Sequence, residues 1–208
     1  MHCVSTDNHL INMTLFKNKY RIESTRLANY NYSQSGMYFI TICCKNREHY
    51  FGEIVDLEMR LNKIGKIVET EWLQTPKIRL DMNLLLDEFV IMPNHFHAIL
   101  IIGENEYNKT MQRRDAMHCV STDNATNKRN KFGPQSKNLS SIVRGFKSSV
   151  TINTRETNSA FAWQSRYHEH IIKDSFDLNR IQNYITTNPQ HWKDDCFNET
   201  NTFLGQII

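Results

Sequence analysis

The sequence lacks long apolar runs. No hydrophobic stretch approaches the roughly 20 residues that a membrane-spanning helix needs. The N-terminus also lacks a charged segment followed by an apolar one, which is the pattern of an export signal. We therefore expect a cytoplasmic protein. Its 208 residues, 39% of them hydrophobic and 11% aromatic, fit one soluble globular domain with a sizeable core.

The chain also lacks a cysteine framework. It has 5 cysteines, an odd number, and none belongs to a C-x-x-C pair. Cys43 and Cys44 are neighbours, so their side chains would point to opposite faces of a strand. This pattern argues against disulfides and against a zinc knuckle, and we expect reduced, structural thiols.

A strong net charge is missing as well. The formal charge at pH 7 is +3, which is too small to indicate a nucleic-acid partner by itself. The excess is concentrated between residues 109 and 155, in Lys109, Arg113, Arg114, Lys128, Arg129, Lys131, Lys137, Arg144, Lys147 and Arg155. A clustered positive surface is typical of contact with a phosphate backbone, although a solvated loop explains the cluster when it is taken alone.

The order of the periodic segments predicts the fold. Strands are expected at 37–45, 84–92, 95–102 and 168–173, and helices at 62–74, 139–151 and 176–187. Pro76 and the Asn188-Pro189 pair are expected to stop the first and the last helix. This order indicates the α+β class and a ferredoxin-like (split βαβ) fold, an antiparallel sheet with helices packed on one face.

Composition suggests the domain boundaries. We divide the chain into a polar N-terminal segment at 1–29, one domain at 30–192 and a C-terminal tail at 193–208. Residues 104–138 show no sustained period, and we predict that they form a long insertion in the domain.

An octapeptide occurs twice in the chain. Met117–Asn124, inside the predicted insertion, repeats Met1–Asn8 letter for letter. Eight residues are too few for a structural repeat unit, which usually needs about 20 to 50. We interpret both copies as translations of one dispersed DNA repeat, placed where a chain tolerates insertion best.

The most informative motif places two histidines at the start of an apolar strand. His95 and His97 are at i and i+2, directly after Pro93-Asn94. Side chains alternate across a strand, so both imidazoles should share one face, with Cα atoms about 6.6 Å apart. Because an unpaired polar ring in so apolar a strand would be costly, we interpret the pair as metal ligands. Histidines satisfied by a backbone carbonyl or by water are the alternative.

The final predicted helix presents a phenol and an amide on one face. Tyr184 and Asn188 are at i and i+4, one helical turn apart. Tyrosine can act as a nucleophile, although its pKa near 10 requires a metal-polarised phosphate or a neighbouring base. An ordinary half-buried aromatic beside Ile181 and Ile185 is the alternative, and the helix alone favours it.

Together these motifs resemble the His-hydrophobic-His single-strand endonucleases, specifically the one-tyrosine transposases of the IS200 type and, above all, the REP-associated tyrosine transposases. The resemblance extends from about Tyr30 to Trp192. It is carried by Tyr38–Cys43, Arg47–Gly52, Asn62–Gly65, Met92–His97, Ile142–Lys147 and the tail from Trp163–Tyr167 through Asn188–Pro189. Met-Pro-Asn-His-Phe-His ahead of an apolar run is highly specific in this context.

The resemblance implies a metal-dependent transesterification on single-stranded DNA beside a hairpin. Tyr184 matches the family's nucleophile, which would form a 5′-phosphotyrosine and release a 3′ hydroxyl. His95 and His97 match the metal-binding pair. Asn188 lies where relatives use an amide as the third ligand, although many IS200-type relatives carry glutamine there. The ion would be Mg²⁺ or Mn²⁺.

Other partners follow from charge and from the same resemblance. We select Arg144, Lys147 and Arg166 for contacts to backbone phosphates, with a solvated helix face as the alternative for each. We expect no membrane partner, and we leave a homodimer open.

Three alternatives remain at this point. Tyr167 is a competing nucleophile, although it precedes a strand. The chain could instead be a non-catalytic ferredoxin-like module that binds single-stranded nucleic acid. A His-x-His phosphoesterase is disfavoured because Ile99 stands where such enzymes carry a third histidine or a threonine.

The repeat hypothesis makes a testable prediction. Deleting residues 117–124 should leave folding and activity nearly intact, because a structureless insertion contributes little to a packed core. Soluble expression of the deletion variant, compared with the intact chain, measures the effect. Loss of soluble protein would contradict the hypothesis.

Overall fold

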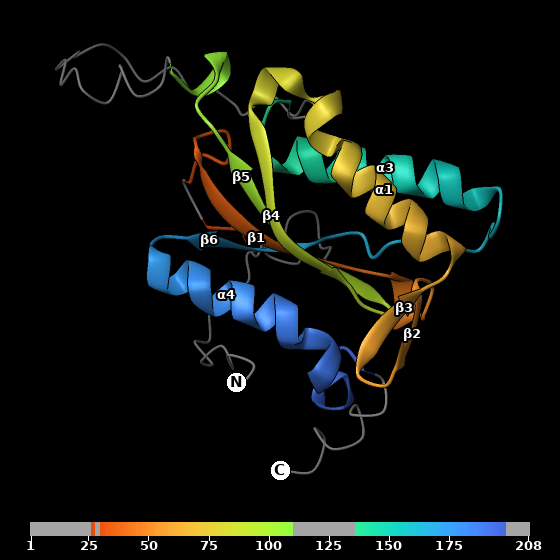
Figure 1. Ribbon diagram of the computed structural model, residues 1–208. Coiled ribbons are helices and arrows are strands. Elements are labelled where there is room, and N and C mark those ends of the chain that lie inside the picture. Colours follow the sequence, from red (N-terminus) through yellow and green to blue (C-terminus); the bar gives the residue numbers. More distant parts are fainter. Residues whose placement is uncertain (1–25, 28–29, 110–135, 199–208) are drawn as a thin grey trace, which may run out of the picture.

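The computed structural model describes residues 26–27, 30–109 and 136–198 (Figure 1). Most of the predicted N-terminal segment and of the predicted insertion lies outside the described residues, including both copies of the octapeptide. No helix of the described part is long and apolar enough to span a membrane.

A four-stranded antiparallel sheet forms the centre of the fold. Its strands are β1 (Gly36–Cys43), β4 (Leu84–Ile91), β5 (His95–Ile102) and β6 (His168–Ile172), hydrogen-bonded in the order β4-β5-β1-β6. Every neighbouring pair is antiparallel. The ferredoxin-like fold class is thereby confirmed, and each strand begins and ends within two residues of its predicted bounds.

Helices cover both faces of this sheet (Figure 1). α1 (Lys63–Ile78) and α3 (Leu139–Arg155) pack together on one face, as predicted, while α4 (Ser175–Thr187) lies against the other. Alternation along β5 directs Phe96 towards α1 and α3, and Ile99 towards α4. The helix that carries Tyr184 therefore faces the odd-numbered residues of β5.

Aromatic rings fill the core between β5 and the helix pair. The ring of Phe96 lies 5.0 Å from Trp72 of α1 and 5.4 Å from Phe146 of α3, measured between centroids. All three rings are buried. Burying such a ring stabilises a fold by about 1.5–3 kcal/mol, so this cluster holds β5 firmly from one side.

The helices depart from the predicted bounds in a few places. The prediction that Pro76 stops α1 is wrong, because the helix continues to Ile78 with Pro76 in its last turn. Pro76 has no N–H to donate to the backbone oxygen four residues earlier, so the helix continues past it without this one hydrogen bond. Asn62 is the N-cap, and its side chain accepts from the backbone N–H groups of Ile64 and Gly65.

Several short elements were not predicted. They are the hairpin of β2 (Gly52–Val55) and β3 (Glu58–Leu61), and the 3-10 helices η1 (Lys45–Arg47), η2 (Leu80–Met82) and η3 (Asn188–Asp194). Segments of three to seven residues are too short to show a reliable hydrophobic period. The three described cysteines, Cys43, Cys44 and Cys196, are free thiols, and the first two are buried.

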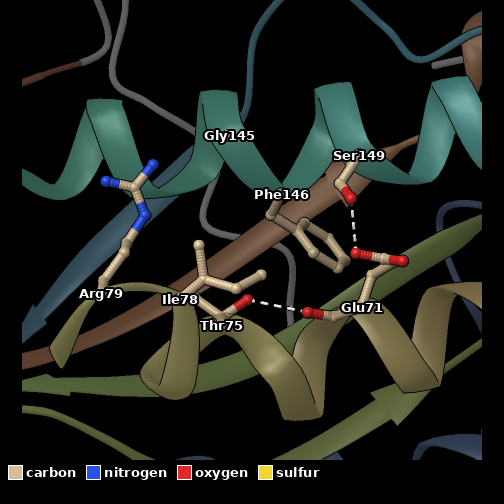
Figure 2. Close-up of a pocket in the computed structure, with 7 residues that line it drawn as sticks. All are labelled: Glu71, Thr75, Ile78, Arg79, Gly145, Phe146 and Ser149. Carbon is tan, nitrogen blue, oxygen red and sulfur yellow. Dashed lines mark hydrogen bonds between the residues drawn. The ribbon is translucent and has the colours of Figure 1, made fainter.

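Polar side chains bridge α1 and α3 around a small pocket of about 140 Å³ (Figure 2). Glu71 of α1 accepts hydrogen bonds from Ser149 and Asn153 of α3. At the other end of the pocket, the Arg79 guanidinium donates to the backbone oxygen of Ser141 over 2.8 Å. The Arg79 guanidinium also lies close to Gly145, where an added Cβ would be 2.3 Å from Arg79 Nη2.

Two helical glycines should respond differently to alanine. A Cβ at Gly65 would lie 2.3 Å from the backbone oxygen of Phe51, whereas one at Gly145 would meet only the tip of the flexible Arg79 side chain. We expect Gly65→Ala to lower the free energy of unfolding by about 1–3 kcal/mol, because the backbone must shift. Gly145→Ala should change it by less than about 1 kcal/mol, since the higher helix propensity of alanine offsets the displacement of Arg79. Urea unfolding measures both values, and equal losses would contradict this reasoning.

Candidate active site

The two histidines of β5 lie side by side on the face that α4 covers. Their ring centroids are 4.5 Å apart, as the i, i+2 spacing predicts for one face of a strand. They follow the tight connection between β4 and β5, where the backbone N–H of Met92 donates to the oxygen of His95. His95 is 0% exposed and His97 is 1% exposed.

His97 is held between β1 and α4. Its Nδ1 lies 2.8 Å from the hydroxyl of Thr41, the residue opposite it in the β1–β5 register. Its ring stacks on Phe39, with centroids 5.3 Å apart. Its other nitrogen, Nε2, lies 3.3 Å from the hydroxyl of Tyr184. The sequence-predicted ligand and the sequence-predicted nucleophile are therefore in contact.

The orientation of His95 is set by the amide of Asn94. The Asn94 Nδ2 group donates to the backbone oxygens of Arg47 and Phe197, over 3.0 and 2.9 Å. Its Oδ1 therefore faces His95 Nδ1, at 2.8 Å, and must accept the imidazole proton. In a neutral imidazole the other nitrogen then carries a lone pair, so His95 Nε2 is an acceptor.

Tyr184 and Asn188 occupy successive turns at the end of α4, as predicted. Tyr184 is half-buried and lies edge-on to Phe39, with centroids 6.1 Å apart. Asn188 is 3% exposed, and its side chain donates a hydrogen bond to the Asp195 carboxylate. No described residue bonds to Asn188 Oδ1.

The segment after α4 covers the histidines, and the sequence prediction missed it. Phe197 lies over His95, with centroids 4.6 Å apart, and Asp195 Oδ2 is 3.9 Å from His95 Nε2. Arg47 holds this segment in place by donating to the backbone oxygen of Cys196 over 2.7 Å. An aromatic and an acidic residue just beyond the last predicted helix were the only signal that could have drawn attention to it.

Burial decides the protonation of the site. It lowers the pKa of His97 to about 3. The pKa of His95 also lies well below its usual value, first because of burial and then because of the neighbouring His97. Burial raises the pKa of the Asp195 carboxyl. Both imidazoles are therefore neutral near pH 7, which is the form that binds metal ions.

The side chains that the sequence predicts as metal ligands are of mixed type. Within the described residues, no group of three or more histidine, cysteine, aspartate or glutamate side chains is placed to hold a metal ion. The predicted set of His95, His97 and Asn188 combines two imidazoles with an amide, and its third donor is Asn188 Oδ1.

The other predicted site residues lie elsewhere. Lys147 belongs to α3, on the opposite face of the sheet from α4, and its ammonium donates to the backbone oxygens of Gln164 and Arg166. Burial lowers the pKa of Lys147. Arg144 and Arg166 are exposed. Tyr167 packs in the core on the α1 and α3 side, where its hydroxyl contacts Arg26 over 3.1 Å. The structure thus brings Tyr184, and not Tyr167, to the histidines.

No family model matches the chain. A Haemophilus influenzae protein that is described as uncharacterized is 41% identical over 173 residues, which cover 83% of this chain and 90% of the relative. The chain belongs to the same family as this protein.

The solved structure of a REP-associated tyrosine transposase bound to a REP hairpin has the same fold. It aligns with a TM-score of 0.50 over 82% of this chain and 74% of that chain, at 18% sequence identity. The resemblance inferred from the motifs is thereby confirmed at the level of the fold.

The buried histidines make stability depend on pH in a defined direction. The pKa of His97 is about 3 when folded, against about 6.5 when unfolded, so the unfolded state binds more protons between these values. The stabilisation is complete above pH 6.5 and is lost as the pH falls towards 3. We expect His97→Gln to reduce the decline in unfolding free energy between pH 6.5 and 4 by up to about 1.4 kcal/mol per pH unit. Urea unfolding across this range measures the slope.

The control for this prediction is His168→Gln, which changes an exposed histidine on β6. Its slope should match that of the unmodified chain. A His97→Gln slope equal to that of the control would show that His97 titrates normally in the folded protein.

Proposed function

We propose that this chain is a transposase-type endonuclease and strand transferase that acts on single-stranded DNA beside a hairpin. One contact carries the proposal: the Tyr184 hydroxyl on α4 lies 3.3 Å from His97 Nε2 on β5. A phenol beside a pair of neutral imidazoles is the arrangement that metal-assisted attack on a phosphodiester requires. The fold shared with a transposase solved in complex with a REP hairpin supports this substrate class.

Tyr184 is the nucleophile in the proposed reaction. Its phenolic oxygen attacks the scissile phosphorus, and the bond from phosphorus to the 3′ oxygen of the preceding nucleotide breaks. The products are a 5′-phosphotyrosine and a free 3′ hydroxyl, whose hydrogen balances the one lost by the phenol. One phosphoester bond replaces another, so a 3′ hydroxyl can later attack the phosphotyrosine and rejoin the strands.

A divalent cation, Mg²⁺ or Mn²⁺, fits the donor atoms of this site. His95 Nε2 and Asn188 Oδ1 are buried and have no hydrogen-bond partner among the described residues. His95, His97 and Asn188 would hold the ion, and two imidazoles with an amide suit Mn²⁺ better than Mg²⁺. When bound, such an ion polarises the scissile phosphate and orients it for in-line displacement.

DNA can reach this site only after a local rearrangement. Both imidazoles are buried, and Phe197 lies over His95. We therefore propose that the segment after α4 moves before the scissile phosphate approaches Tyr184. The backbone of Phe197 forms no hydrogen bond within the sheet. Its oxygen accepts from the Asn94 side chain instead.

Backbone phosphates would be bound by the basic residues selected from the sequence. Arg144 and Arg166 are exposed to solvent. Lys147 already donates to two backbone oxygens of the 164–166 segment, so its contribution would be to position Arg166. Contacts of this kind weaken as salt rises, because counterions compete for the phosphates.

Replacing the nucleophile tests the proposal. With a fluorescent hairpin that carries a single-stranded flank, the unmodified chain should form an adduct that survives denaturation in Mn²⁺ and not in EDTA. Tyr184→Phe should abolish this adduct while the affinity for the hairpin stays within about twofold, since binding depends on phosphate contacts. Denaturing gels measure the adduct, and fluorescence anisotropy measures binding.

Tyr167→Phe is the matched control, because it removes the other tyrosine hydroxyl that the sequence places near a histidine pair. It should retain the adduct. An adduct that persists in Tyr184→Phe and vanishes in Tyr167→Phe would show that Tyr167 is the nucleophile. Hairpin binding without an adduct in any metal would identify a non-catalytic binding module.

A further inference from the structure

Two buried acceptors, one on β5 and one at the end of α4, receive no hydrogen bond from the part of the chain that the structure describes. They are His95 Nε2 and Asn188 Oδ1, and no described residue donates to either atom. An unsatisfied buried polar atom costs a fold about 1–3 kcal/mol, so a pair of them in one site indicates a missing ligand. Because both atoms are acceptors, the missing ligand is a hydrogen-bond donor or a cation.

Asp195 adds a third acceptor to the same place. Its Oδ2 lies 3.9 Å from His95 Nε2, and its other oxygen accepts from the backbone N–H of Phe197 over 2.7 Å. The proton of His95 is on Nδ1, where Asn94 accepts it, so no proton lies between the imidazole and the carboxylate. A lone pair and a carboxylate oxygen thus face each other in a buried site, and a cation between them would turn this repulsion into attraction.

We propose that Asp195 is a further ligand of the divalent cation, which it binds together with His95 and Asn188. This inference rests on the metal site of the proposed function and adds to it a residue outside the His-x-His motif. Two metal–ligand bonds of about 2.1 Å span up to about 4.2 Å, so one ion can bridge a separation of 3.9 Å. A carboxylate also supplies the negative charge and the hard oxygen that Mg²⁺ and Mn²⁺ prefer.

Asp195→Asn is the informative variant, and Asp194→Asn is its control. The asparagine keeps the size of Asp195 and an oxygen that can accept from the Phe197 N–H, so the local fold is preserved. The amide of the new asparagine can also donate to His95 Nε2, so a hydrogen bond takes the place of the proposed metal–nitrogen bond. Asp194 is the preceding residue, and its side chain is exposed.

The experiment titrates Mn²⁺ into the metal-free full chain and follows free Mn²⁺ by electron paramagnetic resonance. We expect Asp195→Asn to weaken Mn²⁺ binding at least tenfold, and Asp194→Asn to leave it unchanged. Thermal unfolding gives a second readout: Mn²⁺ should raise the unfolding temperature of the unmodified chain and of Asp194→Asn, and much less that of Asp195→Asn. Without metal, Asp195→Asn should unfold at a temperature no lower than that of the unmodified chain. A purely structural role for Asp195 would lower this temperature.

Two results would overturn the inference. One is equal Mn²⁺ affinity of Asp195→Asn and Asp194→Asn, and the other is an unmodified chain that binds no Mn²⁺. If Asp195→Asn does not fold, Asp195→Ser takes its place, because a hydroxyl can also accept from the Phe197 N–H.

The adduct assay keeps this inference distinct from the proposed function. Binding of Mn²⁺ through Asp195 without a Tyr184 adduct contradicts only the function. An adduct together with unchanged Mn²⁺ affinity in Asp195→Asn contradicts only the role of Asp195.

Discussion

The arrangement of the site depends on the buried side-chain amide of Asn94. Its two hydrogens are taken by the backbone oxygens of Arg47 and Phe197, and its oxygen accepts from His95. One group thus joins the turn before β5 to the loop after β1 and to the segment after α4. It also determines the tautomer of His95, and with it the direction of the nitrogen that can bind a metal ion.

The two faces of the sheet are packed by apolar clusters of different size. On one face, Phe96 packs between Trp72 and Phe146, so β5 is held by a large aromatic core. On the other face, α4 is held by a smaller apolar cluster around Ile99 and Ile185. The histidines are therefore fixed on a strand, whereas the helix that carries Tyr184 needs less free energy to shift, because fewer buried contacts hold it.

Burial would strengthen the binding of the proposed cation. Three acceptor groups, from His95, Asn188 and Asp195, lie in a region from which water is excluded. In such surroundings the attraction between a cation and these atoms is stronger than it would be in water. The imidazoles stay neutral for the same reason, so they need not lose a proton before they bind a metal ion.

Local patterns predicted the parts of the site that lie within one element. The i, i+2 spacing of His95 and His97 and the i, i+4 spacing of Tyr184 and Asn188 follow from the periods of strand and helix. The order of elements was enough for the ferredoxin-like class. The prediction that α1 ends before Pro76 was wrong, because helix propensity is only one contribution to the stability of a helix. The packing of α1 against α3 and the sheet outweighs it.

The short hairpin of β2 and β3 had no local signal, and the segment from Trp192 to Asn198 had only an aromatic and an acidic residue to indicate it. Their positions depend on contacts such as Arg47 with the oxygen of Cys196, which joins residues 149 positions apart. By itself, the sequence determined that the two imidazoles share one face of a strand, because alternation is a property of the local backbone. Only the tertiary structure decided that Asp195 and Phe197 lie over them, because contacts between distant residues arise from the packing of the whole chain.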